Sequence, residues 1–416
     1  MKVLWFEVTT PSRYTGQGLV IGGWQDSLER IVRTCSDIEL FIAFESQWPQ
    51  EKKIIDGVIY LPLNVCYTKK EKKQAKTTWD VNATKLVPLM KEVVSEVEPD
   101  IIQVFGTEWP FGLIAKYTDI PVIVHIQGAM APYNNALFPP GYNFLNVAKE
   151  IGWKHPKQIL EAWKNYQFDL SRTAIDKQVW EAVSFYMGRT KWDEALSAVM
   201  HPGRKYFHVE EALRPQFTSG QFVWKAPKSQ HVKLISTGCS NFWKGPDMLL
   251  KVAHLLTNLG IEFEWDVAGY MPESLRRMVE QKENYRFEDN HVHFLGYIQP
   301  DELAERLCAS TMYVHTAYVE NSPNSICEAQ CMGVPIVSTN VGGISTLVKH
   351  AEQGFLVPAN DPWQMAHAII HLASDYDMMI HFSESSKLVA KQRHDDQHIL
   401  EQLRHVYTTL LNFSHL

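Results

Sequence analysis

The sequence predicts an α/β protein made of two doubly wound, Rossmann-like domains, each built on a parallel sheet. The chain has 416 residues, which is too long for one ordinary hydrophobic core. Short, continuous apolar runs recur along it and alternate with amphipathic stretches of helical length. Because strands that are buried on both faces are apolar throughout, this alternation indicates parallel sheets covered by helices on both sides.

A first series of strands and helices occupies the N-terminal half of the chain. Strands are expected at residues 3–8, 38–44, 101–105 and 122–126, with helices at 23–35 and 81–97. Residues 140–200 are richer in helix and in tryptophan, so we interpret them as a helical insertion in the first domain. These elements predict an N-terminal Rossmann-like domain over residues 1–220.

A second series follows a segment, residues 219–228, that has the composition of a linker. Strands are expected at 232–236, 263–268, 291–294, 312–316 and 335–338, with helices near 246–259, 300–309, 323–332 and 361–373. They predict a second domain over residues 221–394, and a last helix at about 395–416 is expected to pack back on the first domain. Ligands of doubly wound sheets bind beyond the carboxyl ends of the strands, here in a cleft between the domains.

The distribution of charge argues against a nucleic acid partner. The formal net charge is −7. Residues 1–215 carry 25 basic and 25 acidic side chains, so the 15 basic and 22 acidic side chains of residues 216–416 account for all of it. Binding to a phosphate backbone requires a basic surface. The one basic cluster, Lys69 to Lys73 with Lys76, is interpreted as a solvated loop, and a weak peripheral contact with an anionic membrane is the alternative.

Further features predict a cytoplasmic protein. No apolar run approaches the roughly 20 residues that span a bilayer. The apolar N-terminal stretch is interrupted by Glu7 and is interpreted as a first strand instead of a signal peptide. The six cysteines lack the paired spacing of a zinc site, which favours a reduced compartment. The oligomeric state is not indicated.

The segment from Glu320 to Glu328 is the strongest candidate for a functional site. It follows an apolar strand, and Pro323 suits the start of a helix. Free N–H groups at a helix start suit a phosphate group, and carboxylates on either side can accept hydrogen bonds from sugar hydroxyls. The two glutamates alone are equally compatible with a structural helix. The predicted ligand contacts of this segment, besides Glu320, are Asn321, Ser322, Asn324, Ser325 and Glu328.

Other segments at strand ends favour the functional interpretation. Lys244 lies in the turn between the strand at 232–236 and the next helix, where its ammonium group can reach a diphosphate. Gly342 and Gly343 follow the strand at 335–338 and can bring backbone amides close to a ligand. Residues 354–362 lead into the next helix.

With these segments in place, the sequence resembles glycosyltransferase family 4, the retaining transferases with the two-domain GT-B fold. The resemblance covers most of residues 231–373. Its motifs are Lys244-Gly245, Gly296-Tyr297-Ile298, Glu320 with Glu328-Ala329, Gly333-Val334-Pro335-Ile336-Val337, Gly342-Gly343 and Gly354-Phe355-Leu356-Val357-Pro358. It implies a nucleoside diphosphate sugar as the donor substrate, a hydroxyl group of a glycan, lipid-linked or small-molecule acceptor, and no other cofactor.

The resemblance extends less densely into the N-terminal half, as expected if residues 1–220 form the acceptor-binding domain and residues 221–394 the domain that binds the nucleotide-sugar donor. Gly22 and Gly23 are similar to the family's glycine loop, which opens a helix towards the donor. His125, at the end of the strand at 122–126, is similar to the histidine that the family places beside the donor sugar. A histidine that ends an apolar strand is otherwise more often a core residue. The resemblance thus implies His125, Glu320 and Lys244 as the catalytic residues.

Two positions depart from the family pattern. Family members usually carry an arginine five residues before the lysine, where this chain has Cys239, and many have a glutamate at the position of Thr346. We expect the missing cation to come from elsewhere and hypothesise that Arg189 supplies it to the diphosphate. Glu211 is expected either to line the interdomain cleft or to have an ordinary surface role.

The mechanism implied is a transfer with retention, without a metal ion. The only Asp-x-Asp sequence, Asp375 to Asp377, lies between two predicted helices and is interpreted as a helix cap. Other enzymes considered are a sugar-nucleotide epimerase or a phosphorylase on the same fold, and the non-enzymatic alternative is a carbohydrate-binding scaffold. A nicotinamide dehydrogenase is the weakest alternative, because no Gly-x-Gly-x-x-Gly follows a strand.

Overall fold

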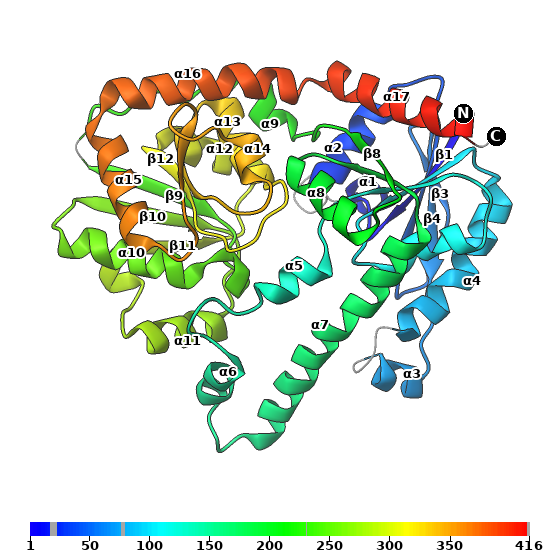
Figure 1. The fold of residues 1–416 in the computed structure, drawn as a ribbon, viewed down its shortest axis with the longest axis horizontal. Helices are drawn as coiled ribbons and strands as arrows, with labels where there is room; N and C mark the ends of the chain where they lie inside the picture. The colour runs from blue at the N-terminus through cyan, green and yellow to red at the C-terminus, as the bar shows by residue number, and fades with distance from the viewer. Residues whose placement is uncertain (17–22, 76–79, 230, 414–416) are drawn as a thin grey trace. The chain divides into compact units, whose positions relative to one another are not determined.

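The computed structural model describes residues 1–16, 23–75, 80–229 and 231–413 (Figure 1). The chain divides into two compact units. The N-terminal unit comprises Met1–Asn134, Trp163–Arg214 and Arg393–Leu416, and the C-terminal unit comprises Asn135–Ala162 and Pro215–Gln392. Each unit has its own parallel sheet.

The sheet of the N-terminal unit has the strand order β3-β4-β2-β1-β5-β6-β7-β8 in the described part of the chain. All pairs are parallel except β3–β4. Since β1 connects to β2 on one side and pairs with β5 on the other, the direction of winding changes at β1. The strands are β1 (Lys2–Glu7), β2 (Glu39–Ser46), β3 (Lys53–Ile55), β4 (Val58–Asn64), β5 (Ile101–Phe105), β6 (Val122–His125), β7 (Phe185–Gly188) and β8 (Lys205–His208).

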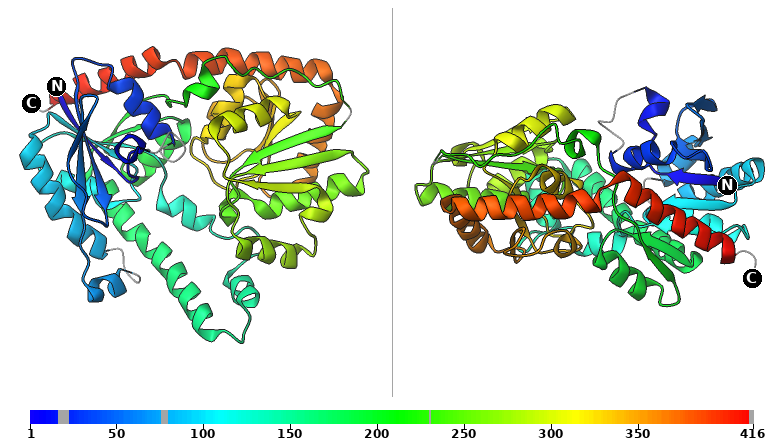
Figure 2. Two further views of the ribbon diagram at one scale, coloured as in Figure 1. Left: turned by 180° about the vertical axis from the view of Figure 1, so that it is seen from behind. Right: turned by 90° about the horizontal axis from the view of Figure 1, so that it is seen from above.

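Helices cover both faces of this sheet (Figures 1 and 2). Residues of β1 alternate between two cores: Leu4 and Phe6 pack with α4, η1 and α7, whereas Val3 and Trp5 pack with α2 and α17. The helical elements are α1 (Ser12–Thr15), α2 (Gly23–Val32), α3 (Lys69–Gln74), α4 (Asp80–Val97), η1 (Pro110–Lys116), α5 (Met130–Asn135), α7 (Pro156–Ala182), α8 (Lys191–Met200) and α17 (Asp396–Phe413).

The last helix, α17, is part of the N-terminal unit. Its Tyr407 is fully buried, and the phenol oxygen accepts a hydrogen bond of 3.0 Å from the Trp5 indole and donates one of 2.6 Å to Gln103. Arg30 on α2 forms a two-pronged ion pair with Asp396 at the start of α17. The end of the chain therefore completes the core on one face of the first sheet.

The sheet of the C-terminal unit has the order β11-β10-β9-β12-β13-β14, and its pairs are parallel. The direction of winding changes at β9, which lies between β10 and β12. The strands are β9 (Val232–Thr237), β10 (Phe263–Ala268), β11 (Val292–Gly296), β12 (Met312–His315), β13 (Ile336–Thr339) and β14 (Gly354–Val357).

Helices again lie on both faces of this second sheet: α10, α11 and α15 pack together on one side, and α12 and α13 lie on the other (Figure 1). The predicted fold class, two doubly wound parallel-sheet units, is therefore confirmed. The helical elements are α6 (Phe144–Ile151), α9 (Pro215–Thr218), η2 (Phe242–Lys244), α10 (Pro246–Asn258), α11 (Glu273–Glu283), η3 (Glu288–Asn290), α12 (Pro300–Ala309), α13 (Asn324–Met332), α14 (Ile344–Leu347), α15 (Pro362–Ser374) and α16 (Tyr376–Arg393).

One segment of the predicted insertion belongs to the other unit. We expected residues 140–200 as part of the first domain, but Asn135–Ala162 pack with the C-terminal unit. Tyr142 donates a hydrogen bond of 2.6 Å to Glu283, and its ring lies 5.2 Å from that of Phe242. These contacts join residues far apart in sequence, and the tryptophan-rich composition did not reveal them.

Several strands were not predicted from the sequence, namely β3, β4, β7, β8 and β14. β7 lies in the region, residues 140–200, that we interpreted as helical; β8 follows that region, and β14 lies where a loop into the next helix was expected. Among the described residues, the structure has no helix that is both long and apolar enough to cross a membrane.

Candidate active site

Two loops meet at the carboxyl edge of the second sheet, where the winding changes. The loop after β9 ends in η2 and carries Lys244, and the loop after β12 carries Glu320. β9 and β12 are hydrogen-bonded neighbours, so their ends lie side by side. The structure therefore brings together two of the residues that the sequence analysis selected.

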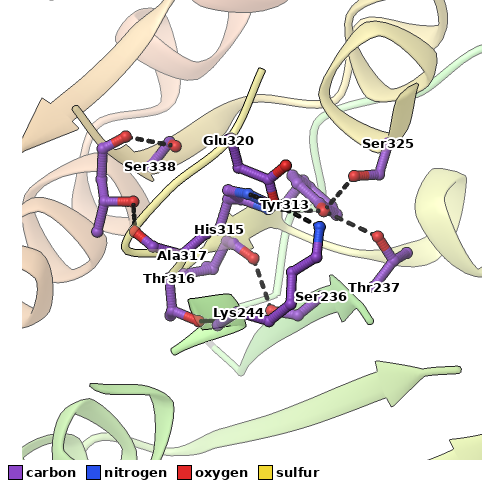
Figure 3. Close-up of polar contacts among 12 residues, drawn as sticks. Ser236, Thr237, Lys244, Tyr313, His315, Thr316, Ala317, Glu320, Ser325 and Ser338 are labelled. Carbon is purple, nitrogen blue, oxygen red and sulfur yellow. Dashed lines mark hydrogen bonds and ion pairs between the residues drawn. The ribbon is translucent and has the colours of Figure 1, made fainter. Parts of the chain in front are cut away.

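Lys244 and Glu320 form an ion pair. The Lys244 ammonium lies 2.5 Å from Glu320 Oε1, with the lysine side chain 29% exposed and the carboxylate 7% exposed (Figure 3). Burial by itself raises the pKa of Glu320, but the charge of Lys244, followed by His315, outweighs burial and lowers the pKa to about 2. The carboxylate is consequently ionised at neutral pH in a site with little access to water.

A polar chain that the sequence analysis missed supports this pair (Figure 3). His315 Nε2 lies 3.2 Å from Glu320 Oε1, and His315 Nδ1 lies 3.2 Å from the Tyr313 hydroxyl. That hydroxyl donates a 2.7 Å hydrogen bond to Ser325 on α13 and lies 2.9 Å from the Thr237 hydroxyl. Tyr313 and His315 lie in β12, whose other residues are apolar. The sequence feature that could have revealed this chain of contacts is a histidine at the carboxyl end of a parallel strand.

Glycines allow the site loops to approach each other. Gly342 has a φ of +52°, and a Cβ there would collide with the Glu320 carbonyl oxygen, which also accepts a 3.1 Å hydrogen bond from the Gly343 N–H. Gly245, with a φ of +71°, likewise leaves no space for a Cβ beside the Thr316 carbonyl oxygen. The Thr316 hydroxyl in turn donates to the Lys244 carbonyl oxygen at 2.9 Å. The glycines thus fix the backbone on both sides of the ion pair.

Helix α13 begins beside the ion pair, at Asn324. Pro323 occupies its N-cap position and has no side chain that could accept a hydrogen bond from the first turn. Its first turn therefore retains the partial positive charge of a helix N-terminus. Of the predicted contact residues, Asn321, Ser322 and Glu328 are buried, Glu328 with only 1% exposed, whereas Asn324 and Ser325 are half-buried.

Cys239, at the position where the resemblance leads one to expect an arginine, carries no charge. Its side chain is buried, and burial raises the pKa of the thiol to about 12 although Lys244 acts in the opposite direction. The protonated thiol cannot replace a cation. Within the described part of this unit, Lys244 and the α13 N-terminus are the positive groups that the structure places at the site.

His125 ends β6 in the N-terminal unit and is completely buried. Its ring packs edge-on against Trp24, with centroids 4.7 Å apart, and lies 5.9 Å from Phe105. Among the described residues, neither ring nitrogen has a hydrogen-bond partner. Burial, and then the charge of Arg189, lower the pKa of His125 well below its usual value, so the imidazole is neutral.

The hypothesis for Arg189 needs correction. Its guanidinium is 3% exposed, lies 3.0 Å from Glu211 Oε1 and stacks 4.6 Å from the Trp24 ring. It also donates to the Ile126 carbonyl oxygen at 3.3 Å. Because a buried carboxylate neutralises it within the N-terminal unit, Arg189 does not present a free charge for a diphosphate. Glu211 is the partner of Arg189 and has a structural role.

The remaining predicted residues lie elsewhere. Gly23 is the first residue of α2, and Gly22 falls outside the described residues. Asp375 Oδ1 accepts a 2.9 Å hydrogen bond from the Met378 N–H at the start of α16, which confirms its predicted capping role. Thr346 is half-buried in α14.

The fold defines the class of protein. Sucrose-phosphate synthase from Thermosynechococcus elongatus superposes with a TM-score of 0.74 at 14% identity, covering 99% of both chains. HepE of Anabaena, in complex with UDP-glucose, superposes with a TM-score of 0.67 at 14% identity, covering 98% of this chain and 100% of that chain. The chain therefore has the GT-B fold, with its candidate site at the carboxyl edge of the second sheet.

The sequence of the second unit matches a known protein family. Residues 222–389 match the family described as glycosyl transferases group 1, and this range contains Lys244, His315, Glu320 and α13. The C-terminal unit is therefore similar in sequence to the glycosyl transferases group 1.

Individual relatives are more distant. A D-inositol 3-phosphate glycosyltransferase from Streptomyces bingchenggensis is 28% identical over 278 residues, which cover 63% of this chain and 56% of that protein. The enzyme of the same name from a Nocardioides strain is 26% identical over 260 residues, covering 59% of this chain and 53% of that protein. The chain thus spans about half the length of these curated relatives.

Proposed function

We propose that this protein transfers a sugar from a nucleoside diphosphate sugar to a hydroxyl group of an acceptor. The observation that carries the proposal is the Lys244–Glu320 ion pair, 2.5 Å between Nζ and Oε1, beside the N-terminus of α13 within the family match. An ammonium and a helix N-terminus suit a diphosphate, and an ionised carboxylate next to them suits sugar hydroxyls.

Each group has a distinct proposed role. Lys244 and the first turn of α13, including Asn324 and Ser325, bind the diphosphate. Glu320 accepts hydrogen bonds from the donor sugar, and Glu328 is proposed to bind the ribose, a role that requires its buried carboxylate to become accessible. His125 keeps the sugar contact implied by the family resemblance; as a neutral imidazole it can donate or accept one hydrogen bond.

The proposed step is a substitution at the anomeric carbon. The bond from this carbon to the β-phosphate oxygen breaks, a bond to the acceptor oxygen forms on the same face, and the departing diphosphate takes the acceptor proton. Negative charge grows on the diphosphate as the bond breaks, so Lys244 and α13 stabilise the transition state more than the ground state. Retention, a hexose as the transferred sugar and independence from metal ions are parts of this proposal.

A ligand screen followed by product analysis tests the proposal. Thermal shifts are measured with UDP-, GDP- and ADP-sugars, starting with UDP-glucose because HepE was crystallised with it. The stabilising donor is then incubated with candidate acceptors, with and without EDTA, and products are examined by NMR. We expect release of the nucleoside diphosphate, an unchanged anomeric configuration and no loss of rate with EDTA.

The same assay separates the alternatives. An epimerase would convert the donor sugar without an acceptor and without releasing the nucleoside diphosphate. A carbohydrate-binding scaffold would bind glycans but give neither hydrolysis nor transfer. Absence of any shift with all three donor classes would contradict the proposed donor site.

A further inference from the structure

Helix α6 and the first turns of α7 form a hairpin that projects an unusual surface. On its inner side, α6 packs on α11 (Figure 1). Ala148 is buried there, and Glu150 lies 2.8 Å from the guanidinium of Arg277. This inner side anchors the hairpin to the C-terminal unit, so its outer side is held by ordered structure.

The hairpin carries large apolar side chains in contact with water. Trp153 is 69% exposed, Leu145 66% and Leu160 53%. Exposed lysines alternate with them along the chain. We call the following set the hairpin surface: Leu145, Lys149, Trp153, Lys154, Lys157 and Leu160.

Charge on the hairpin surface is positive. Between residues 144 and 160 the only carboxylate is Glu150, whose side chain is 6% exposed and paired with Arg277; the next one is Glu161. The protein as a whole has a formal net charge of −7. Long-range attraction by the whole molecule therefore would not bring it to an anionic surface, and any such binding must arise locally.

We propose that the hairpin surface docks on an anionic lipid bilayer. A tryptophan and two leucines can enter the interface between headgroups and acyl chains, where indole rings are favoured. Lysines beside them can contact anionic headgroups, and each adds affinity. A neutral protein partner would leave three clustered lysines without a complementary charge, which favours the lipid surface.

The other basic cluster, on α3, has lysines but no apolar side chains beside them. Helix α3 carries Lys69, Lys70, Lys72 and Lys73, but its six residues include no apolar side chain. It therefore offers charge without an inserting group. We expect it to contribute less than the hairpin surface, although the sequence analysis gave this cluster, as the alternative to a solvated loop, a weak membrane contact.

Vesicle flotation tests this proposal with the full-length protein. Neutral vesicles of phosphatidylcholine are compared with vesicles containing one third phosphatidylglycerol, at low and at high salt. We expect flotation with the anionic vesicles only, and a loss of binding at high salt because exposed charges are screened.

Paired variants assign the binding to residues. Trp153→Gln with Leu160→Gln is expected to weaken partitioning by about tenfold or more, because two inserting side chains are lost. Lys154→Gln with Lys157→Gln is expected to weaken it on the order of fivefold per lysine. The matched controls are Trp48→Gln, which removes another tryptophan that is 76% exposed, and Lys72→Gln with Lys73→Gln on α3.

The outcomes are separable from those for sugar transfer. Donor binding in solution should be the same in all four variants, which also shows that they are folded. Flotation that is lost in both hairpin variants and retained in both controls supports the proposal. It is overturned if the wild type does not float with anionic vesicles, if it floats equally with neutral ones, or if only the α3 variant loses binding.

Discussion

Buried carboxyl groups at the carboxyl edges of the two sheets have pKa values that are shifted in opposite directions. In the C-terminal unit, Glu320 is held ionised with a pKa of about 2. In the N-terminal unit, Glu7 ends β1 and Glu108 follows β5, and burial is the main cause that raises the pKa of both. The pKa of Glu108 rises to about 7, and that of Glu7 lies well above its usual value.

The neighbouring charges explain this difference. Glu320 has the Lys244 ammonium at 2.5 Å, whereas Glu7 has two further carboxylates, Glu29 and Asp26, that raise its pKa beyond the effect of burial. Depth alone therefore does not set the charge of a carboxylate; the nearest cation does. The cationic edge suits an anionic donor, whereas the edge with Glu7 and Glu108 carries less negative charge than the same carboxyl groups would carry in water.

The largest effect is expected from removing the cation that distinguishes the two edges. Lys244→Met should lower kcat/KM for the donor by about 100- to 1000-fold, because a preorganised positive charge at the leaving diphosphate is lost. Among the described residues, the buried Glu320 side chain then keeps His315 as its partner, so we also expect a stability loss of about 1–3 kcal/mol after allowance for the partial exposure of Lys244. Steady-state kinetics and urea unfolding measure both.

Lys251→Met is the matched control for this variant. Lys251 pairs with the buried Asp247 at 3.0 Å and is 22% exposed, so its removal also breaks an ion pair in the same unit. It lies inside α10, whereas Lys244 lies in the turn before that helix. If both variants lost the same kinetic activity, the special role of Lys244 would be disproved.

A smaller effect is expected from disturbing the backbone of the donor edge. Gly342→Ala places a methyl group against the Glu320 carbonyl oxygen, and Gly238→Ala introduces the same residue at a φ of +73° with open space around it. Both variants lose stability because alanine disfavours a left-handed backbone, so the collision is what distinguishes the two variants. We expect Gly342→Ala to be less stable than Gly238→Ala by about 1–3 kcal/mol. Equal free energies of unfolding would show that the loop carrying Glu320 moves to accommodate the methyl group without a loss of stability.

The sequence predicted the residues at the carboxyl edge of the C-terminal sheet better than the neighbours that set their charge. Strands such as β6 and β12 are apolar up to their last residue, and residues that follow parallel strands lie at one edge of the sheet, which made Lys244 and Glu320 recognisable. β4 was missed because Pro62 falls within an otherwise mostly apolar run. Short strands such as β7, which has four residues, are too short to show a recognisable hydrophobic pattern.

Pairings between distant residues could not be predicted in the same way. The Arg189–Glu211 pair and the Tyr142–Glu283 hydrogen bond depend on where whole elements pack. Arg189 therefore looked like a free cation, and the segment around Tyr142 looked like part of the first domain. His315 was overlooked because a polar residue at the end of a strand has no distinct signal unless its partner, Glu320, is known to lie beside it.

The smallest effect is expected at the neutral edge and depends on pH. Since the pKa of Glu108 is raised from 4.5 to about 7 in the folded state, the folded protein retains a proton that the unfolded chain releases. Stability should thus fall as pH rises from about 4.5 to about 7 and then level off. Glu108→Gln removes this loss. The full pKa change corresponds to about 3 kcal/mol, but Glu108 is only half-buried and water screens the effect, so the variant should gain about 1–2 kcal/mol relative to wild type between pH 4.5 and pH 8.

Glu92→Gln provides the charge-matched control, because Glu92 is exposed on α4 and meets water in both states. Its difference from wild type should stay constant over the same range, measured by urea unfolding at several pH values. If the Glu108→Gln difference were constant too, the carboxyl group would be ionised in the folded protein. The contrast between the two sheet edges would then rest on Glu7 alone, whose own substitution by glutamine would have to show the pH dependence.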